Sequence, residues 1–281
     1  MLPALFRHIS RFISAKFFTM EKYTLITGAT SGIGYELAKQ FAKNGHNLII
    51  TSRDQEALDQ KAKELSGYGI KVETISKDLF KPNSAQELYH EIKTKGVEVN
   101  ILVNNAGQGQ YGEFKDTDIN RELDIIQLNI CSLVVLTKCF LKDMLEQGGG
   151  KILNVSSIAS KFPGPYQSVY HGTKAFVQSF TEAVRNEVKD KGIVVTALLP
   201  GVTDTDFFNK ADMLNSKAVQ DESAMADPAD VAEDGYYALM GDKDMVVSGA
   251  MNKVQVAMAS VTPDNIAAEQ TKKKQEPVGK K

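Results

Sequence analysis

The chain of 281 residues carries 33 lysines and arginines against 35 aspartates and glutamates, which gives a formal net charge of −2. This balance offers no electrostatic reason to expect nucleic acid as a partner. Hydrophobic residues make up 42% of the chain and charged residues 24%, an ordinary share for a soluble globular protein. The length allows one large domain with a full core, or two small ones.

The two cysteines, Cys131 and Cys139, fall on one predicted helix. Their spacing along a rigid helix is about 12 Å, too far for a disulfide. No cluster of histidines or carboxylates accompanies them, so no metal site is predicted. They are expected to be buried core thiols in a reducing compartment, and the protein to be cytoplasmic. We find no apolar run long enough to span a bilayer.

Residues 1–19 differ from everything after them, because apolar residues recur there at helical spacing with basic and no acidic residues between them. Three interpretations stay open: an amphipathic helix on a membrane surface, a targeting segment, and an extension of a domain that starts near Met20. The charges interrupt the apolar run too often for a secretory signal.

From Tyr23 onward, short apolar runs typical of buried strands alternate with amphipathic segments typical of helices. The predicted strands are 23–27, 47–52, 71–76, 100–104, 151–156, 193–199 and 245–248. The predicted helices are 35–44, 55–66, 83–94, 121–147, 168–190 and 228–240. This order predicts an α/β fold: a single doubly wound parallel sheet, Rossmann-like, with helices on both faces. Without an internal repeat or a linker, residues 20–262 are expected to form one domain.

Two segments do not fit the alternation. The polar loop 206–227 separates two well-defined elements, and loops of this length are usually lids or disordered inserts. The lysine-rich residues 263–281 are expected to form a flexible, solvated tail.

A glycine-rich turn, Gly28, Gly32 and Gly34, follows the first strand and opens a helix. Glycine allows a sharp turn and lets backbone N–H groups approach a pyrophosphate at a helix N-terminus. The position after the first strand of a long strand–helix series favours dinucleotide binding over a purely structural turn.

The end of the second strand bears on the choice of cofactor. Arg53 stands where a carboxylate would hold the adenosine ribose of NAD, with Asp54 next to it. An arginine can take the extra phosphate of NADP, which a carboxylate would repel. NADP(H) is therefore favoured over NAD(H), and Asp54 keeps NAD open.

The stretch from Ser157 to Lys174 places a serine thirteen residues before Tyr170, and the tyrosine four before the lysine. Four residues make one helical turn, so the phenol and the amine share a helix face. An ammonium about 4 Å from a phenol supplies several kcal/mol at the effective dielectric usual in proteins. The spacing therefore predicts a tyrosine whose lowered pKa allows proton transfer at neutral pH.

In kind and order, these motifs resemble those of the short-chain dehydrogenase/reductase family, and its NADP-type keto-reductase-like branch in particular. The likeness covers roughly residues 22–248. The motifs are TGATSGIG at 27–34, Asp78-Leu79, NNAG at 104–107, Asn129, Ser157, Tyr170 with Lys174, and Pro200-Gly201.

The resemblance implies a catalytic set: Tyr170 exchanges the proton and Ser157 orients the substrate oxygen, so both contact the substrate. Lys174 lowers the phenol's pKa and binds the nicotinamide ribose, and Asn129 holds a water of a proton relay. His171 should point elsewhere, as a partly exposed structural residue. The resemblance implies that the cofactor is bound by Gly28, Thr30, Ser31, Gly32, Ile33, Gly34, Arg53, Asp78, Leu79, Asn105, Ala106, Gly107, Tyr170, Lys174, Pro200, Gly201, Val202 and Thr205.

Together these observations predict an NADP(H)-dependent oxidoreductase that moves hydride between nicotinamide and a carbonyl or alcohol, with reduction of a ketone or aldehyde favoured. Two alternatives stay open: an NAD-dependent alcohol dehydrogenase, and a dinucleotide-binding sensor or scaffold without turnover. The resemblance also implies a homodimer or homotetramer, and residues 1–19 leave peripheral membrane contact open.

Overall fold

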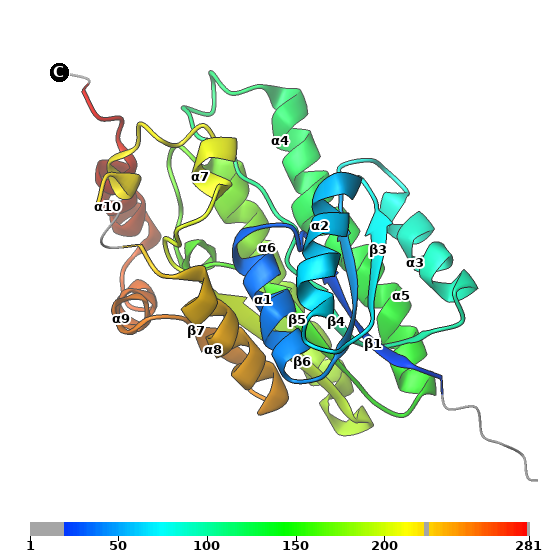
Figure 1. Ribbon diagram of the computed structural model, residues 1–281. Helices are drawn as coiled ribbons and strands as arrows, with labels where there is room; N and C mark the ends of the chain where they lie inside the picture. The colour runs from blue at the N-terminus through cyan, green and yellow to red at the C-terminus, as the bar shows by residue number, and fades with distance from the viewer. Residues whose placement is uncertain (1–19, 222–224, 280–281) are drawn as a thin grey trace, which may run out of the picture.

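The computed structural model describes residues 20–221 and 225–279, so the predictions for residues 1–19 lie outside the described part. Its centre is a parallel seven-stranded sheet in the order β3-β2-β1-β4-β5-β6-β7 (Figure 1). The strands are β1 Lys22–Thr27, β2 Asn47–Ser52, β3 Val72–Ser76, β4 Glu98–Asn104, β5 Gly150–Val155, β6 Ile193–Leu199 and β7 Met245–Val247. The predicted fold class is confirmed.

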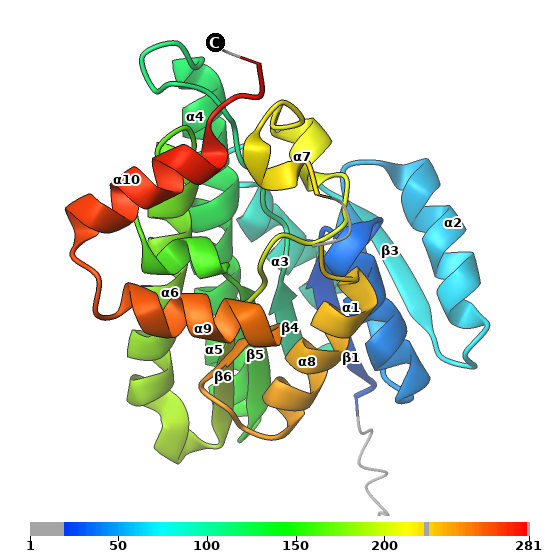
Figure 2. The same ribbon diagram turned by 90° about the vertical axis from the view of Figure 1, so that its left-hand side faces the viewer.

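Helices cover both faces of the sheet (Figures 1 and 2). One apolar core joins the sheet to α3, α5 and α6, and a second joins the opposite face to α1, α2 and α8. The strands read as near-continuous apolar runs because both of their faces are covered. The helices are α1 Gly32–Lys43, α2 Gln55–Ser66, α3 Ser84–Thr94, α4 Ile119–Ile126, α5 Leu133–Glu146, α6 Ser168–Val188, α7 Phe207–Lys210, α8 Pro228–Met240, α9 Ala250–Ala259 and α10 Asp264–Gln275.

The order of the strands reverses at β1, which pairs with β2 on one side and with β4 on the other. In open α/β sheets, ligands bind outside the carboxyl ends of the strands at such a switch point. The loops that follow β1, β2, β4, β5 and β6 carry most of the predicted site residues. The others lie in the first turn of α1, in the loop after β3, in the π-helix and on α6. The fold therefore gathers motifs that lie far apart in the sequence.

The predicted helix 121–147 is continuous but not uniform. Between α4 and α5, residues Gln127–Ser132 wind as a π-helix. This combined helix, Ile119–Glu146, is the one described helix long and apolar enough to cross a membrane, which corrects our reading of the sequence; 44% of its most apolar window is buried inside the fold. Core helices of soluble proteins share this composition.

The cysteines also differ from prediction. Cys131 is exposed and Cys139 half-buried, and both are free. They lie on the π-helix and on α5, on a side of the helix that the sheet does not cover. The prediction of core thiols is therefore wrong, although the predicted absence of a disulfide between them is confirmed.

The C-terminal segment is the largest departure from expectation. Residues 264–275 form α10, in which Ala267, Thr271 and Gln275 are buried, so a flexible tail is wrong for this part. The chain beyond α10 pairs with the loop before α8: Ser216 and Pro277 form an antiparallel bridge, and the Val278 N–H donates to the Asn215 carbonyl at 2.7 Å. Figure 2 shows α9 and α10 lying across the front of the molecule.

Candidate active site

The turn between β1 and α1 has the shape of a phosphate cradle. Gly28 has φ +66°, and its N–H donates to the Thr51 carbonyl at 2.8 Å. A Cβ on Gly34 would lie 2.2 Å from the Gly28 carbonyl oxygen, so only glycine fits there. Ser31 caps α1 without a side-chain hydrogen bond, which leaves the first N–H groups of the helix available to an anion. The residues fit a dinucleotide pyrophosphate.

The loop after β4 is fixed to this cradle. The side-chain amide of Asn105 donates to the carbonyls of Thr27, at 2.9 Å, and Gly28, at 3.1 Å. The Thr27 hydroxyl accepts the N–H groups of Asn105 and Ala106, both at 3.0 Å. The side chain of Asn105 therefore holds the two loops together, and the backbone of Ala106 and Gly107 lines the cavity.

In the turn after β2, the neighbouring residues Arg53 and Asp54 have different roles. The Asp54 carboxylate accepts the Ala57 N–H at 3.0 Å and so caps α2. The Arg53 guanidinium lies 4.8 Å from the centroid of the Phe80 ring, at the cavity wall. Lys77 lines the same wall, which sequence reasoning missed. Asp78 does not line the cavity; its carboxylate accepts the Phe80 N–H at 3.2 Å and shapes the turn.

Tyr170 and Lys174 stand on one face of α6, as the spacing predicted, with Ser157 beside them at the end of β5. The Lys174 ammonium is 5% exposed and donates to the Val155 carbonyl at 2.8 Å. It lies 5.8 Å from the centroid of the Tyr170 ring. The Ser157 hydroxyl donates to the Pro200 carbonyl at 3.4 Å and accepts the Ala159 N–H at 3.1 Å, and its proximity lowers the pKa of the phenol. The structure therefore brings the three predicted catalytic side chains together in one cavity.

The electrostatics of this group differ from the prediction. Burial raises the pKa of Tyr170 to about 12, and the nearby Ser157 hydroxyl only partly offsets this. Burial also lowers the pKa of Lys174 to about 8. Burial disfavours the charged form of each group and is the largest cause of both shifts in pKa. The prediction that the pKa of Tyr170 is lowered is therefore wrong. Tyr170 is protonated at neutral pH.

Asn129 sits in the π-helix with its side chain fully engaged. Its amide nitrogen donates to the Gln108 carbonyl at 2.9 Å and to the Thr173 hydroxyl at 3.0 Å. Its oxygen accepts the Gln108 N–H at 2.9 Å. The side chain thus ties the loop after β4 to α6, one residue before Lys174. Asn129 does not line the cavity, and the predicted water relay stays a prediction.

The loop after β6 forms a further wall of the cavity. Pro200, Gly201, Val202 and Thr205 all line the cavity. A Cβ on Gly32 would lie 2.9 Å from the Thr205 methyl group, which shows how closely this loop approaches the glycine turn. Every predicted cofactor residue except Asp78 lines the same cavity.

The cavity continues past Tyr170 to a total volume of about 700 Å³. Its further wall comes from the predicted lid and the C-terminal helices and mixes apolar with polar side chains. Phe207, Phe208, Met213 and Met258 line it together with Lys210, Gln255, Gln270 and Lys274. The Phe207 and Tyr170 rings lie 5.2 Å apart. The lid residues pack on a small core of their own, formed by Ala211, Met213 and Val219. Sequence reasoning found none of the C-terminal residues here.

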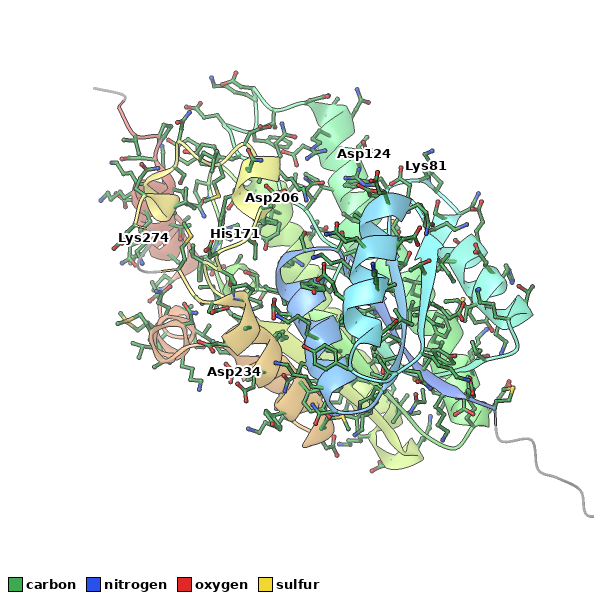
Figure 3. All side chains as sticks on the ribbon, viewed as in Figure 1. Lys81, Asp124, His171, Asp206, Asp234 and Lys274 are labelled. Atoms are coloured by element: carbon green, nitrogen blue, oxygen red, sulfur yellow. The ribbon has the colours of Figure 1, made fainter. Side chains whose placement is uncertain are left out.

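His171 is also placed differently from the prediction. It is 5% exposed and lines the cavity, and its Nδ1 lies 2.9 Å from the Phe162 carbonyl. Burial lowers its pKa, so the ring is neutral. Figure 3 shows His171 on the same side of the molecule as Asp206, before α7, and Lys274, on α10. The prediction of a partly exposed structural residue that points away from the site is therefore wrong for His171.

The chain belongs to the short chain dehydrogenase family, whose sequence model matches residues 22–214. It is 38% identical over 185 residues to the very-long-chain 3-oxoacyl-CoA reductase of Anas platyrhynchos, a match that covers 63% of this chain and 58% of that protein. The match with sulfoacetaldehyde reductase 2 of Chromohalobacter salexigens has 35% identity over 223 residues and covers 78% of this chain and 88% of the relative.

Solved structures agree with the fold. A short-chain dehydrogenase from Sphingobium yanoikuyae in complex with NADPH aligns with a TM-score of 0.76 at 27% identity. The alignment covers 86% of this chain and 96% of that one. The residues of the glycine cradle, together with the family, identify the cavity as a site for a nicotinamide dinucleotide, NAD(H) or NADP(H).

Proposed function

We propose that this protein is an NADP(H)-dependent oxidoreductase that reduces a ketone or aldehyde to an alcohol. The observation that carries the proposal is the meeting of Ser157, Tyr170 and Lys174 with the glycine cradle in one cavity. The family and the names of the relatives, both reductases, support it. A sensor or scaffold that only binds the dinucleotide would not need a serine, tyrosine and lysine arranged for proton transfer.

Each side chain has a role in such a reduction. A bound nicotinamide dinucleotide supplies the hydride. The protonated phenol of Tyr170 donates its proton to the substrate oxygen as negative charge develops there. Ser157, which lines the same cavity as the phenol, holds that oxygen within reach of Tyr170. Lys174, held by the Val155 carbonyl, lines the cavity beside the phenol, and its positive charge stabilises the resulting phenolate.

The choice of NADP(H) over NAD(H) rests on the turn after β2. Asp54 also lines the cavity, but one of its carboxylate oxygens caps α2, which makes it less available to a ribose. Arg53, steadied by the Phe80 ring, and Lys77 present two cations to the cavity wall. Lys77 also pairs with Glu87 and Glu91, at 3.6 and 3.3 Å, which reduces its contribution. Arg53 is therefore the main partner of an adenosine phosphate.

The substrate class follows from the far wall of the cavity. Its aromatic and methionine side chains favour a carbonyl compound with a sizeable apolar part, such as the acyl chain named for one relative. Lys210 and Lys274 line the same cavity, so an anionic group on the substrate is compatible with it. The homodimer or homotetramer, the cytoplasmic location, the movement of the lid and a membrane role for residues 1–19 stay predictions.

The direct test is turnover. Purified protein with a panel of apolar ketones and aldehydes should oxidise NADPH, followed by absorbance at the nicotinamide band. Tyr170→Phe should lower kcat/KM roughly 10²- to 10⁴-fold, because the variant has no proton to give. Calorimetry should find that Tyr170→Phe still binds NADPH within a few-fold of wild type, because the glycine cradle and Arg53 are unchanged. NADPH binding without turnover on any carbonyl would favour the sensor, and an unaffected Tyr170→Phe would rule out this mechanism.

A further inference from the structure

Three uncharged polar side chains form a buried cluster in the wall of the cavity. Gln167 precedes α6, His171 lies in its first turn, and Gln275 ends α10. They are 5%, 5% and 8% exposed. The amide nitrogen of Gln275 lies 3.4 Å from both Gln167 Oε1 and His171 Nε2. The cluster therefore joins the C-terminal helix to the helix that carries Tyr170.

Two atoms of this cluster have no hydrogen-bond partner. They are the amide nitrogen of Gln167, a donor, and the amide oxygen of Gln275, an acceptor, and both are sealed from water. Buried polar atoms in proteins nearly always have a partner, so each orphan calls for an explanation. Here a donor and an acceptor stand unpaired in the wall of the cavity that holds the catalytic tyrosine.

The orientation of the Gln275 amide follows from its neighbour. His171 Nδ1 donates to the Phe162 carbonyl at 2.9 Å, so Nε2 of the neutral ring is an acceptor. The Gln275 group that faces Nε2 must therefore be its NH₂, which leaves its oxygen as the free acceptor. The position of Gln275 is fixed independently, because its backbone carbonyl accepts from the hydroxyls of Tyr111 and Ser216.

We propose that Gln167 and Gln275 form a second hydrogen-bonding subsite, which selects carbonyl substrates that carry an uncharged hydroxyl or carboxamide away from the reacting carbon. This inference rests on the proposed function. Either group both accepts and donates, and so satisfies both orphan atoms at once. A carboxylate or sulfonate only accepts, and would leave the Gln275 oxygen unpaired. The terminal torsion of glutamine is broad, so each amide can turn toward a group that enters the cavity.

The experiment compares straight-chain methyl ketones with the same ketones carrying one hydroxyl at successive chain positions. In the wild type, kcat/KM for one hydroxyl position should exceed that of the parent ketone roughly 10- to 100-fold, because only that substrate pairs the buried amides. Gln275→Met and Gln167→Met, which keep the size of the side chain, should remove this preference and leave reduction of the parent ketone within a few-fold of wild type.

A matched control separates recognition from folding. Gln60→Met, an exposed position on α2, should change neither substrate. A cluster that only locks α10 to α6 would lower activity on both ketones together and leave their ratio unchanged, and this result would overturn the proposal. So would a wild-type enzyme that reduces every ketone pair equally.

The two proposals fail in different ways. If no ketone is reduced, the proposed function is wrong, while calorimetric binding of the matched alcohols and diols still tests the subsite. Tighter binding of a diol to wild type than to Gln275→Met then supports the subsite, and equal binding contradicts it.

Discussion

The cavity has two halves that are built in different ways. The cofactor half is made of short motifs that each follow a strand, and backbone groups and glycines do most of its work. The substrate half is made of side chains from residues 206–220 and 255–275, which meet only because α9 and α10 fold back across the cavity. The sequence motifs therefore predict the type of reaction. The choice of substrate depends on contacts between segments that lie far apart in the sequence.

The largest effect is expected where backbone packing leaves no room. Gly34→Ala would place a methyl group 2.2 Å from the Gly28 carbonyl oxygen and 2.3 Å from Asn105 Nδ2, atoms that cannot move without breaking the cradle. We expect loss of cofactor binding in calorimetry and a lower melting temperature. Gly172→Ala is the matched control, because a Cβ there meets nothing within 4 Å. In the exposed interior of α6 it should stabilise the protein by roughly 0.5–1 kcal/mol.

Titration of Lys174 tests the burial of the catalytic group. Its pKa is about 8 in the fold against 10.5 when unfolded, so between these values the unfolded chain binds more protons and stability rises with pH. The gain should be on the order of 3 kcal/mol. Tyr170, raised from 10.0 to about 12, acts in the opposite direction, and only above about pH 10. Denaturant unfolding at pH 8 and pH 10 should show the gain in wild type and not in Lys174→Met. An equal slope in both would place the ammonium in contact with solvent.

The preference for NADPH over NADH can be tested by substituting two neighbouring residues, Arg53 and Asp54. Arg53→Ala should weaken NADPH binding about 10- to 100-fold through loss of a charge-assisted bond, with NADH binding unchanged. Asp54→Ala should leave the ratio of the two affinities unchanged and lower stability by about 1 kcal/mol, because it removes only the cap of α2. A selectivity change in Asp54→Ala, rather than in Arg53→Ala, would reverse the roles given to these neighbours.

The sequence predicted most of the fold, because buried strands and amphipathic helices have strong periodicity and glycine turns follow the strands. Helix spacing likewise placed Tyr170 and Lys174 on one face. It did not predict the pKa of Tyr170, which depends on how many atoms surround the phenol rather than on one neighbour. Nor could it predict α10: the lysine-rich stretch lacks apolar periodicity, and its buried face contains Ala267, Thr271 and Gln275, small or polar residues that complement the cavity.

The order in which the chain emerges from the ribosome has a consequence for the pairing of residues 275–278 with the loop at 215–217. Strands β1 to β6 can assemble during synthesis, so the nascent protein acquires its dinucleotide pocket first. The wall that discriminates among substrates is completed only when Val278 has been released. A nascent chain stalled short of this point would have the cofactor pocket without the means to choose a substrate.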